Sequence, residues 1–527
     1  MAYDGSSYGG GYDDSFEERP EFKNARDLEQ QEPDYDTNMV PDVVKSFVVY
    51  LYRYIREKNV YEILQMYEIS FQKLSERMFK QSPWPVVEAI APYVDNDHVF
   101  CLLYRELWFR HVYARLTPTL AQRMESWDNY CSLFQIILHG NVNMQLPNQW
   151  LWDMIDEFIY QFQSYCQYRA KLKTKTEQEL ALLRQYAEVW NVVGVLNYLQ
   201  ALIEKSNIIQ ILEDDKDGSA NFTAQNGYDF QGGGSNVLKV LGYFSIVGLL
   251  RVHCLLGDYY SGLKCLVPID IHQHGVYSNV VGCQITTVYY YVFANLMLRR
   301  YVEAIKACNQ ILLIIHKTKQ DHQASSQFQQ ILKKNEQLYA LLAICLSLCP
   351  QGKLVEENVN SQLREKQGEK MLRMQRNDEA VFDELFSFAC PKFITPSPPN
   401  YEELVNYNQD AYRLQLKLFL SEVRQQQLLS SIRSYLKLYS AIPISKLASF
   451  MDVDEPTVRM ALLTYKHKTH VLDSDGRIVS NADVDFYIDK DVVQIVDSKV
   501  TKRFGDYFIR HILKFEELVG VLESVHL

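Results

Sequence analysis

The hydrophobic positions of the chain follow a helical period over most of its length. From Pro41 onward, apolar residues recur every three or four positions, beginning with the series Val44, Phe47, Val48, Leu51, Tyr54 and Ile55. Such spacing places apolar side chains on one face of an α-helix. Few stretches before about residue 440 alternate with a period of two. The pattern therefore predicts a mainly α-helical protein up to that point.

A sequence repeat lies within this helical region. The run Leu-Gly-Asp-Tyr-Tyr-Ser-Gly at 256–262 is similar to Leu-Arg-Arg-Tyr-Val-Glu-Ala at 298–304, with each residue offset by 42 positions. Each run has a Tyr at a predicted turn between two helices, Tyr259 or Tyr301, and a small residue three positions later. This is the pattern of tetratricopeptide-like hairpins, which stack into a solenoid. We therefore predict a helical-repeat solenoid.

The pattern changes after residue 440. Ser445 is the expected N-cap of a short helix, and Asp454 and Pro456 are the expected start of the next one. The apolar face of that second helix is predicted to comprise Val458, Ala461, Leu462 and Tyr465. Residues 471–497 then alternate as short strands around turns. Three helices followed by a small hairpin predict a winged helix.

An amphipathic helix is predicted at 500–527, after the winged helix. Its apolar residues are spaced by three or four positions and comprise Phe504, Phe508, Ile512, Phe515, Leu518 and Leu522. A long apolar stripe has to be covered by other side chains, and a bundle with partner helices would do so. Packing against its own chain is the alternative. We expect this stripe to be a protein interface, together with the strand residues Val492, Val493, Ile495 and Val496.

Changes in composition divide the chain into six segments. A Pro-rich elbow near 392–401 interrupts the helical repeats. The predicted segments are a disordered acidic tail (1–38), an N-terminal helical domain (39–212), a flexible acidic and Gly-rich loop (213–236), helical repeats (237–423), the winged helix (424–499) and the C-terminal partner helix (500–527).

Charge decides between nucleic acid and protein as the partner of the winged helix. The tail at 1–38 holds 11 Asp and Glu against three Lys and Arg, so it contributes −8 of the net charge of −11. Residues 424–470 hold seven basic and three acidic residues, but 471–497 hold seven Asp against two basic residues. Acids in a wing repel phosphates. We therefore predict a protein-binding winged helix, and a DNA-binding regulator is the alternative.

Residues suited to catalysis or to metal binding are sparse. His272 with His274, and His467 with His470, are candidate metal pairs, but no third ligand follows at a suitable spacing. The Gly-rich run lacks the Lys-Ser/Thr of a phosphate loop, and no nucleophile elbow is present. We predict no metal, no cofactor and no enzymatic activity. A zinc-dependent deubiquitinase-like enzyme stays open as an alternative, which a metal analysis would test.

Basic and aromatic residues alternate between 103 and 116, in the run Leu-Tyr-Arg-Glu-Leu-Trp-Phe-Arg-His-Val-Tyr-Ala-Arg-Leu. Such a run could stack on single-stranded RNA, but aromatic faces of helices more often belong to a core. We therefore predict a core helix here. Direct RNA contact has no further support in the sequence.

The cysteines and the N-terminal residues indicate the cellular compartment of the protein. The ten Cys are scattered and form no Cys-x-x-Cys pair, a pattern typical of reduced thiols in the cytosol. The first residues show no basic and apolar signal segment, and no uninterrupted apolar run approaches about 18 residues. We expect a cytoplasmic protein that does not enter a membrane.

The order of solenoid, winged helix and C-terminal helix resembles the PCI-domain family, which includes scaffold subunits of the proteasome lid, the signalosome and the translation initiation factor three complex. Several runs are similar to the subunit L family of that factor. These are Ser-Pro-Trp-Pro at 82–85, the run at 103–113 quoted in part above, Leu-His-Gly at 138–140, Lys-Val-Leu-Gly-Tyr-Phe-Ser-Ile-Val-Gly-Leu-Leu-Arg at 239–251 and Asp-Lys-Asp-Val-Val-Gln-Ile-Val-Asp-Ser-Lys-Val at 489–500.

The resemblance implies a non-catalytic scaffold in the translation initiation factor three complex. It further implies subunits K and E as neighbours, a helical bundle shared at the C-termini, and recruitment of initiator tRNA and mRNA to the small ribosomal subunit. A scaffold of the proteasome lid or of the signalosome, which would have the same PCI architecture, stays open as an alternative.

Overall fold

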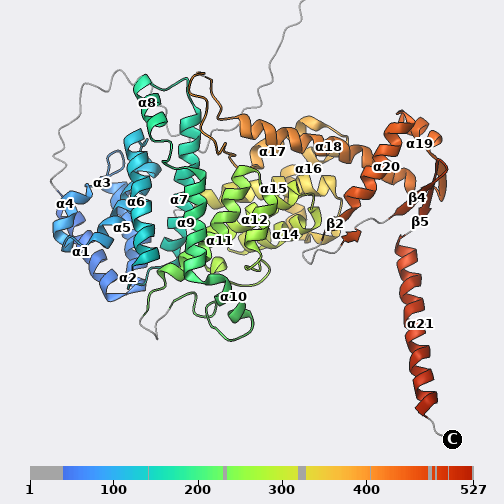
Figure 1. Ribbon diagram of the computed structural model, residues 1–527, viewed down its shortest axis with the longest axis horizontal. Helices are drawn as coiled ribbons and strands as arrows, with labels where there is room; N and C mark the ends of the chain where they lie inside the picture. The colour runs from blue at the N-terminus through green and yellow to red at the C-terminus, as the bar shows by residue number, and fades with distance from the viewer. Residues whose placement is uncertain are drawn as a thin grey trace, which may run out of the picture. The chain divides into compact units, whose positions relative to one another are not determined.

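The computed structural model describes residues 40–140, 142–228, 234–318, 328–403, 405–472, 478–480, 484–496 and 498–524 (Figure 1). The predicted acidic tail at 1–38 lies outside the described residues. The chain forms two compact units. Unit 1 comprises the chain to Leu372 and the segment Asp383–Lys417, and unit 2 comprises Arg373–Phe382 and Leu418–Leu527.

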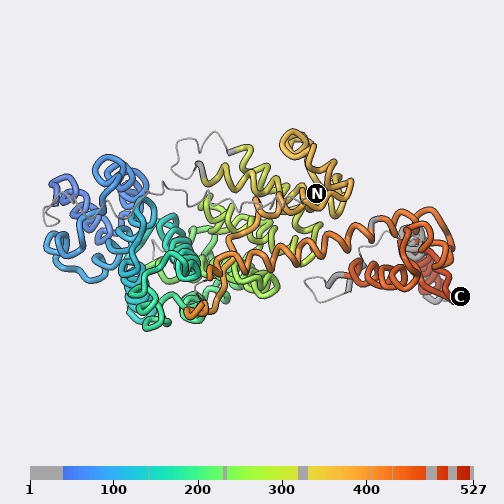
Figure 2. The backbone as a smooth tube through the Cα atoms, turned by 90° about the horizontal axis from the view of Figure 1, so that it is seen from above, coloured from blue at the N-terminus to red at the C-terminus, as the bar shows by residue number. Residues whose placement is uncertain are grey.

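Unit 1 is built of helices that pack side by side along the chain. Neighbouring helices contact one another in pairs such as α5 with α6, α13 with α14 and α14 with α15 (Figures 1 and 2). The α-helices that begin in this unit are α1 (Asp42–Glu57), α2 (Val60–Gln65), α3 (Phe71–Met78), α4 (Val87–Ile90), α5 (His98–Arg115), α6 (Leu120–His139), α7 (Asn148–Ala170), α8 (Glu177–Gln185), α9 (Val192–Ser206), α10 (Ile208–Lys216), α11 (Val237–Leu256), α12 (Tyr259–Leu266), α13 (Val281–Met297), α14 (Tyr301–Thr318), α15 (Phe328–Leu348), α16 (Glu357–Gln375) and α18 (Asp410–Leu436). The mainly α-helical class predicted from the apolar period is confirmed.

The sequence repeat corresponds to two helical hairpins, α11–α12 and α13–α14. Tyr259 and Tyr301 are the first residues of the second helices, and both side chains are buried. Gly257 closes the first turn with a φ of +85°, a left-handed conformation that favours glycine. A Cβ at Gly262 would lie 3.3 Å from the side chain of Leu250, so the small residue lets α12 approach α11 closely. The predicted repeat is therefore confirmed.

Helix α11 is the centre of this stack and contacts α7, α9, α12 and α13. Among the helices of the described residues, α11 alone is long and apolar enough to cross a membrane by length and composition, but 83% of its most apolar stretch is buried inside the protein. An apolar helix surrounded by other helices is what the core of a helical-repeat protein requires.

The segment predicted as a flexible loop at 213–236 is partly structured. Helix α10 continues to Lys216, and the Phe222 side chain is buried. The amide of Asn236 is fully buried and exchanges hydrogen bonds with the backbone of Leu146, at 3.0 and 2.8 Å. The Tyr228 hydroxyl accepts a hydrogen bond from the backbone of Asn148 at 3.1 Å. These contacts anchor both sides of the segment, so the prediction of a flexible loop is corrected outside 229–233, which the structure does not describe.

The Pro-rich elbow runs without helix between α17 (Glu379–Ala389) and α18. Its backbone carbonyls accept hydrogen bonds from the side chains of unit 1, including Gln163 Nε2 to Lys392 at 2.8 Å and Arg169 Nη2 to Pro396 at 2.7 Å. Because proline has no backbone donor, side-chain donors of this kind fix the segment through its carbonyl oxygens.

Unit 2 contains the winged helix. Its elements are the C-terminal part of α18, β1 (Ala441–Pro443), α19 (Ile444–Met451), α20 (Glu455–Thr469), β4 (Asp485–Asp489), β5 (Val492–Val496), and the separate strand pair β2 (His470–Leu472) and β3 (Ile478–Ser480). Strands β1, β4 and β5 form an antiparallel sheet in the order β1-β5-β4. Strand β1 has no counterpart in the sequence prediction.

The predicted start of α20 is confirmed, and that of α19 is wrong. Asp454 caps α20, since its carboxylate accepts a hydrogen bond from the backbone N–H of Thr457 at 3.3 Å. Helix α19 begins at Ile444 after Pro443, so Ser445 is inside the helix and makes no cap. Pro443 is the last residue of β1 and directly precedes α19, so the end of β1 fixes where α19 starts.

One hydrophobic core joins the helices and the sheet of the winged helix. The predicted apolar face of α20 is buried in it, and the rings of Tyr465 and Phe486 lie 6.1 Å apart. The buried members are Leu429, Ile432, Leu436, Ile442, Ile444, Leu447, Ala448, Val458, Ala461, Leu462, Tyr465, Val484, Phe486 and Val493. The winged helix is therefore a folded body with its own core.

Candidate interaction surfaces

Strand β5 is the central strand of the wing sheet. Its residue Val493 lies opposite Ile442 of β1 on one side and opposite Ile488 of β4 on the other. A strand with two neighbours has no free backbone edge, so pairing with the wing of another protein is not open to β5. As part of a protein interface, β5 can therefore offer a partner only its side chains.

The four predicted interface residues of β5 differ in burial. Val493 is fully buried in the winged-helix core, so it stabilises the wing and is not available to a partner. Ile495 is half-buried and packs against the same core. Val492 is half-buried, and Val496 is 38% exposed. The apolar part of the outward-facing surface on β5 is thus Val492 and Val496, and the exposed Tyr487 of β4 lies opposite Gln494 between them.

Cations on the outer face of α20 are neutralised by the wing. Arg459 forms an ion pair with Asp491, and Lys466 Nζ lies 3.4 Å from the carboxylate of Asp485. Between these cations, Met460 and Leu463 are 68% and 54% exposed. A DNA-reading helix needs free cations for phosphates and polar groups for base edges. This face therefore suits protein better than a duplex. Four of the seven predicted acids, Asp473, Asp475, Asp483 and Asp497, lie outside the described residues.

Helix α21 (Ser498–Ser524) carries the predicted apolar stripe, and its large apolar side chains are exposed wherever the structure describes them. Phe508 is 60% exposed, and Phe515 is 65% exposed. The exposed apolar residues are Tyr507, Phe508, Ile509, Ile512, Leu513, Phe515, Leu518, Val519 and Leu522. The side chain of Phe504 is outside the described part.

Five of these residues form a seam that the sequence prediction covered incompletely. Phe508, Ile512, Phe515, Val519 and Leu522 are spaced alternately by four and three residues. This is the heptad spacing of a coiled coil, in which each side chain inserts between side chains of a facing helix. The prediction omitted Val519, although its position four residues after Phe515 would have identified it.

Helix α5, the candidate RNA surface, is a core helix, as predicted. Leu103, Leu107 and Phe109 are buried, and the indole N–H of Trp108 donates to the carbonyl of Trp84 at 2.8 Å. Its cations are paired with acids of unit 1, as with Arg110 and the fully buried Glu106. Neither rings nor cations are therefore presented for single-stranded RNA.

Three of the four histidines in the candidate metal pairs contact neighbouring polar groups of the chain. His272 Nδ1 lies 2.9 Å from the Gln310 amide oxygen, and His274 Nδ1 lies 3.3 Å from the Ser278 hydroxyl. His470 Nδ1 contacts the carbonyl of Lys466 at 2.5 Å. Within the described residues, no group of three His, Cys, Asp or Glu side chains could hold a metal ion.

The fold and its surfaces define a class: a helical-repeat protein with a winged helix of the PCI type and an exposed C-terminal helix. Residues 122–515 match a protein family described as RNA polymerase I-associated factor PAF67. The chain is also similar, over nearly its full length, to proteins named eukaryotic translation initiation factor 3 subunit L. It is 48% identical to that of Nematostella vectensis over 92% of this chain and 94% of the relative. It is 46% identical to that of Gallus gallus and 45% to that of Homo sapiens, over 99% of this chain and 97% of each relative.

The chain therefore belongs to the family of subunit L of eukaryotic translation initiation factor 3. The family match begins within α6 and covers the helical repeats, the winged helix and most of α21. The predicted resemblance is thus confirmed.

Proposed function

We propose that this protein is a non-catalytic scaffold subunit of the cytoplasmic translation initiation factor 3 complex. Its role is to support assembly of the complex and recruitment of initiator tRNA and mRNA to the small ribosomal subunit. The family membership supports the place in the complex. The observation that carries the scaffold role is the exposed heptad seam of α21, since a stripe of large apolar side chains in water is the mark of a protein interface.

Helix α21 is proposed to enter a bundle formed with helices of other subunits of the same factor. Each Phe, Ile, Leu or Val of the seam would contribute about 1.5–3 kcal/mol when fully buried, so the five seam residues together supply a strong contact. The resemblance to the PCI family indicates subunits K and E as the neighbours. The chain would reach the small ribosomal subunit through the complex.

The outward face of the wing is proposed as a second, smaller contact. Val492, Val496 and Tyr487 form its apolar part, and Met460 and Leu463 of α20 are exposed on the same winged helix. Protein interfaces commonly have an apolar centre and a polar rim, and this surface has apolar residues surrounded by paired charges.

The seam is tested by co-purification of the full-length chain from cells. The triple variant Phe508→Ala, Ile512→Ala, Phe515→Ala should retain at least tenfold less of the other subunits of the factor, because the bundle loses three of the five seam side chains. Thermal unfolding of the variant should match that of the wild type, since these side chains are exposed in the free chain.

A matched control changes charged residues of the same helix. Lys514→Ala with Glu517→Ala changes two exposed residues outside the seam and should co-purify normally. Normal co-purification of the triple seam variant would refute the role of α21. Release by both variants would show that the helix as a whole, and not its seam, is recognised.

The alternative of a nucleic-acid-binding regulator makes a different prediction. It requires duplex affinity of the full-length chain that falls steeply with salt, as phosphate contacts release counterions. The pairing of Arg459 and Lys466 with wing acids argues for weak binding without such a slope.

A further inference from the structure

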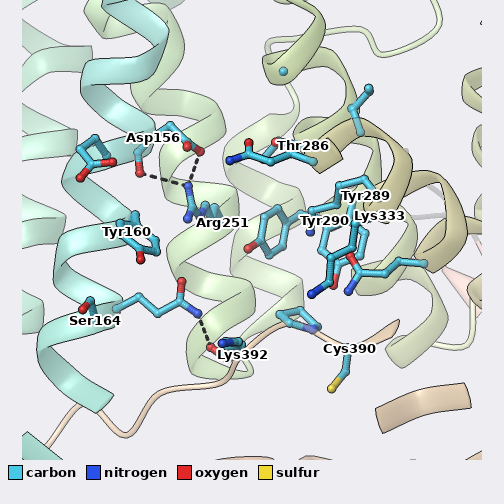
Figure 3. Close-up of a pocket in the computed structure, with 18 of the residues that line it drawn as sticks. Asp156, Tyr160, Ser164, Arg251, Thr286, Tyr289, Tyr290, Lys333, Cys390 and Lys392 are labelled. Carbon is cyan, nitrogen blue, oxygen red and sulfur yellow. Dashed lines mark hydrogen bonds and ion pairs between the residues drawn. The ribbon is translucent and has the colours of Figure 1, made fainter. Parts of the chain in front are cut away.

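A pocket of about 390 Å³ lies inside unit 1, and all of its lining residues belong to that unit. Its walls come from α5, α7, α11, α13, α15, the end of α17 and the segment that follows α17 (Figure 3). Figure 3 shows Asp156 and Tyr160 on one side and Tyr289, Tyr290 and Lys333 on the other. A pocket of this volume can enclose a small organic molecule.

Basic residues outnumber acidic ones in the lining, which contains Arg251, Lys333, Lys334 and Lys392 but, as acids, Asp156 and Glu157. Asp156 is already engaged in an ion pair with Arg251 (Figure 3). Glu157 accepts a hydrogen bond from Gln161 at 2.9 Å, and burial raises the pKa of its carboxyl to about 7. The lining therefore contains more basic than acidic groups.

Lys334 is the cation of this pocket that lies against aromatic rings. Its ammonium lies 3.4 Å from the ring centroid of Tyr289 and 5.7 Å from that of Tyr290. Within the described part of the chain, no carboxylate forms an ion pair with it. Burial and then the charge of Arg251 lower the pKa of Lys334 to about 7. Aromatic faces stabilise an ammonium only partly, so the site favours an added negative charge.

Two further polar atoms of lining residues are unsatisfied. Arg251 Nε and Gln337 Oε1 are buried and have no hydrogen-bond partner among the described residues. The amide nitrogen of Gln337 does donate, to the carbonyl of Phe388 at 3.1 Å. A buried polar atom without a partner costs about 1–3 kcal/mol. A polar occupant of the pocket would supply further electrostatic compensation close to these residues.

We propose that this pocket binds a small phosphorylated molecule through its phosphate group, with Lys334 as the principal contact. A phosphate monoester is close to a dianion at neutral pH, which matches an excess of two basic residues over acids in the lining. Lysine binds phosphate as a point charge and needs no fixed geometry. The ammonium of Lys334 can therefore contact a phosphate while it stays against the two tyrosine rings. The binding of this ligand is independent of the assembly role of α21.

The test is isothermal calorimetry of the full-length chain in a chloride buffer, with pyrophosphate and adenosine monophosphate as probes. We expect saturable 1:1 binding of at least one probe. Lys334→Gln should weaken it at least tenfold, because the principal contact to the phosphate is removed. The control Lys306→Gln should bind as the wild type does, since Lys306 is outside the pocket and pairs with Glu303 at 3.0 Å.

Lys392→Gln provides a second variant from a non-helical segment of the lining, should Lys334→Gln fail to fold. It should weaken binding by a smaller factor. The absence of saturable binding for both probes would overturn the proposal, and so would unchanged affinity in the lysine variants. A heat signal that never saturates would indicate an adventitious ion only and would also overturn it. The α21 seam variant should bind the probes normally.

Discussion

Phe158 and Phe508 carry the same side chain in opposite environments. Phe158 of α7 is fully buried among four other aromatic rings of unit 1, with centroids 5.0 Å from Phe134 and 5.4 Å from Trp190. Phe508 of α21 is 60% exposed. The first ring holds its own chain together. The second is available only to another chain, so a hydrophobic residue contributes to folding or to assembly according to what covers it.

The two regions also differ in how their apolar residues are arranged. In unit 1, the buried apolar residues of α11 lie on most sides of the helix, because other helices pack against it from several directions. In α21, the seam occupies one stripe of the helix at heptad spacing. A single stripe matches one partner surface, which is why α21 is the part of the chain best suited to a bundle with other subunits.

Truncation of the buried ring should have the largest effect. Phe158→Ala should lower the free energy of unfolding by about 3–5 kcal/mol, because it leaves a cavity among tightly packed rings. Phe508→Ala should change it by less than about 0.5 kcal/mol. Urea unfolding of both full-length variants measures the difference. Equal losses in the two variants would mean that α21 is covered by its own chain.

A pH effect should follow from buried acids of unit 1. Burial raises the pKa of Asp153 to about 7, against the opposing charge of Arg110. In the unfolded chain this carboxyl ionises near pH 4. The folded state thus holds the proton over a range where the unfolded state has lost it, and the resulting stabilisation is present at low pH and is lost as pH rises through about 7.

Thermal unfolding between pH 5 and pH 8 measures this effect. The wild type should lose stability relative to Asp153→Asn as pH rises, since the variant cannot ionise at this position. Comparing the two proteins cancels the contribution of the other titrating groups. Parallel curves for both proteins would show that Asp153 has an ordinary pKa.

The smallest difference in the free energy of unfolding is expected between two variants of strand β5. Val493→Ala should lower stability by about 1.5 kcal/mol, at about 0.8 kcal/mol for each buried methylene-sized group removed. Val496→Ala, at a position that is 38% exposed, should lower it less. Chemical unfolding monitored on the full-length chain tests this order. If Val496→Ala instead destabilises the protein more than Val493→Ala does, then Val496, and not Val493, would face the core.

Local signals in the sequence predicted local structure well. Asp454 and Pro456 identified the start of α20, because a cap and a proline act within one helical turn. The apolar period identified α21 and most of its seam. Ser445 misled the prediction because a residue type that often caps a helix was present, while β1 determined the start of α19.

Features that depend on distant residues were not predictable in the same way. The central place of β5 depends on β1, which lies about 50 residues earlier in the chain, so no local pattern separates buried Val493 from exposed Val496. The pocket combines Asp156, Arg251 and Lys334 from three helices that are far apart in sequence. Neither its charge nor its volume is encoded in any one segment.

The central position of β5 also sets an order of events during synthesis of the chain. Both of its partners, β1 and β4, precede it in sequence, so each emerges from the ribosome before the strand that joins them exists. Unit 1 can begin to fold as its helices emerge, since its helix contacts are mostly between neighbours in the chain. The wing sheet has to wait for residue 496, and the α21 seam is made directly afterwards. A nascent chain therefore presents its assembly helix only once the strand that completes the wing has been made.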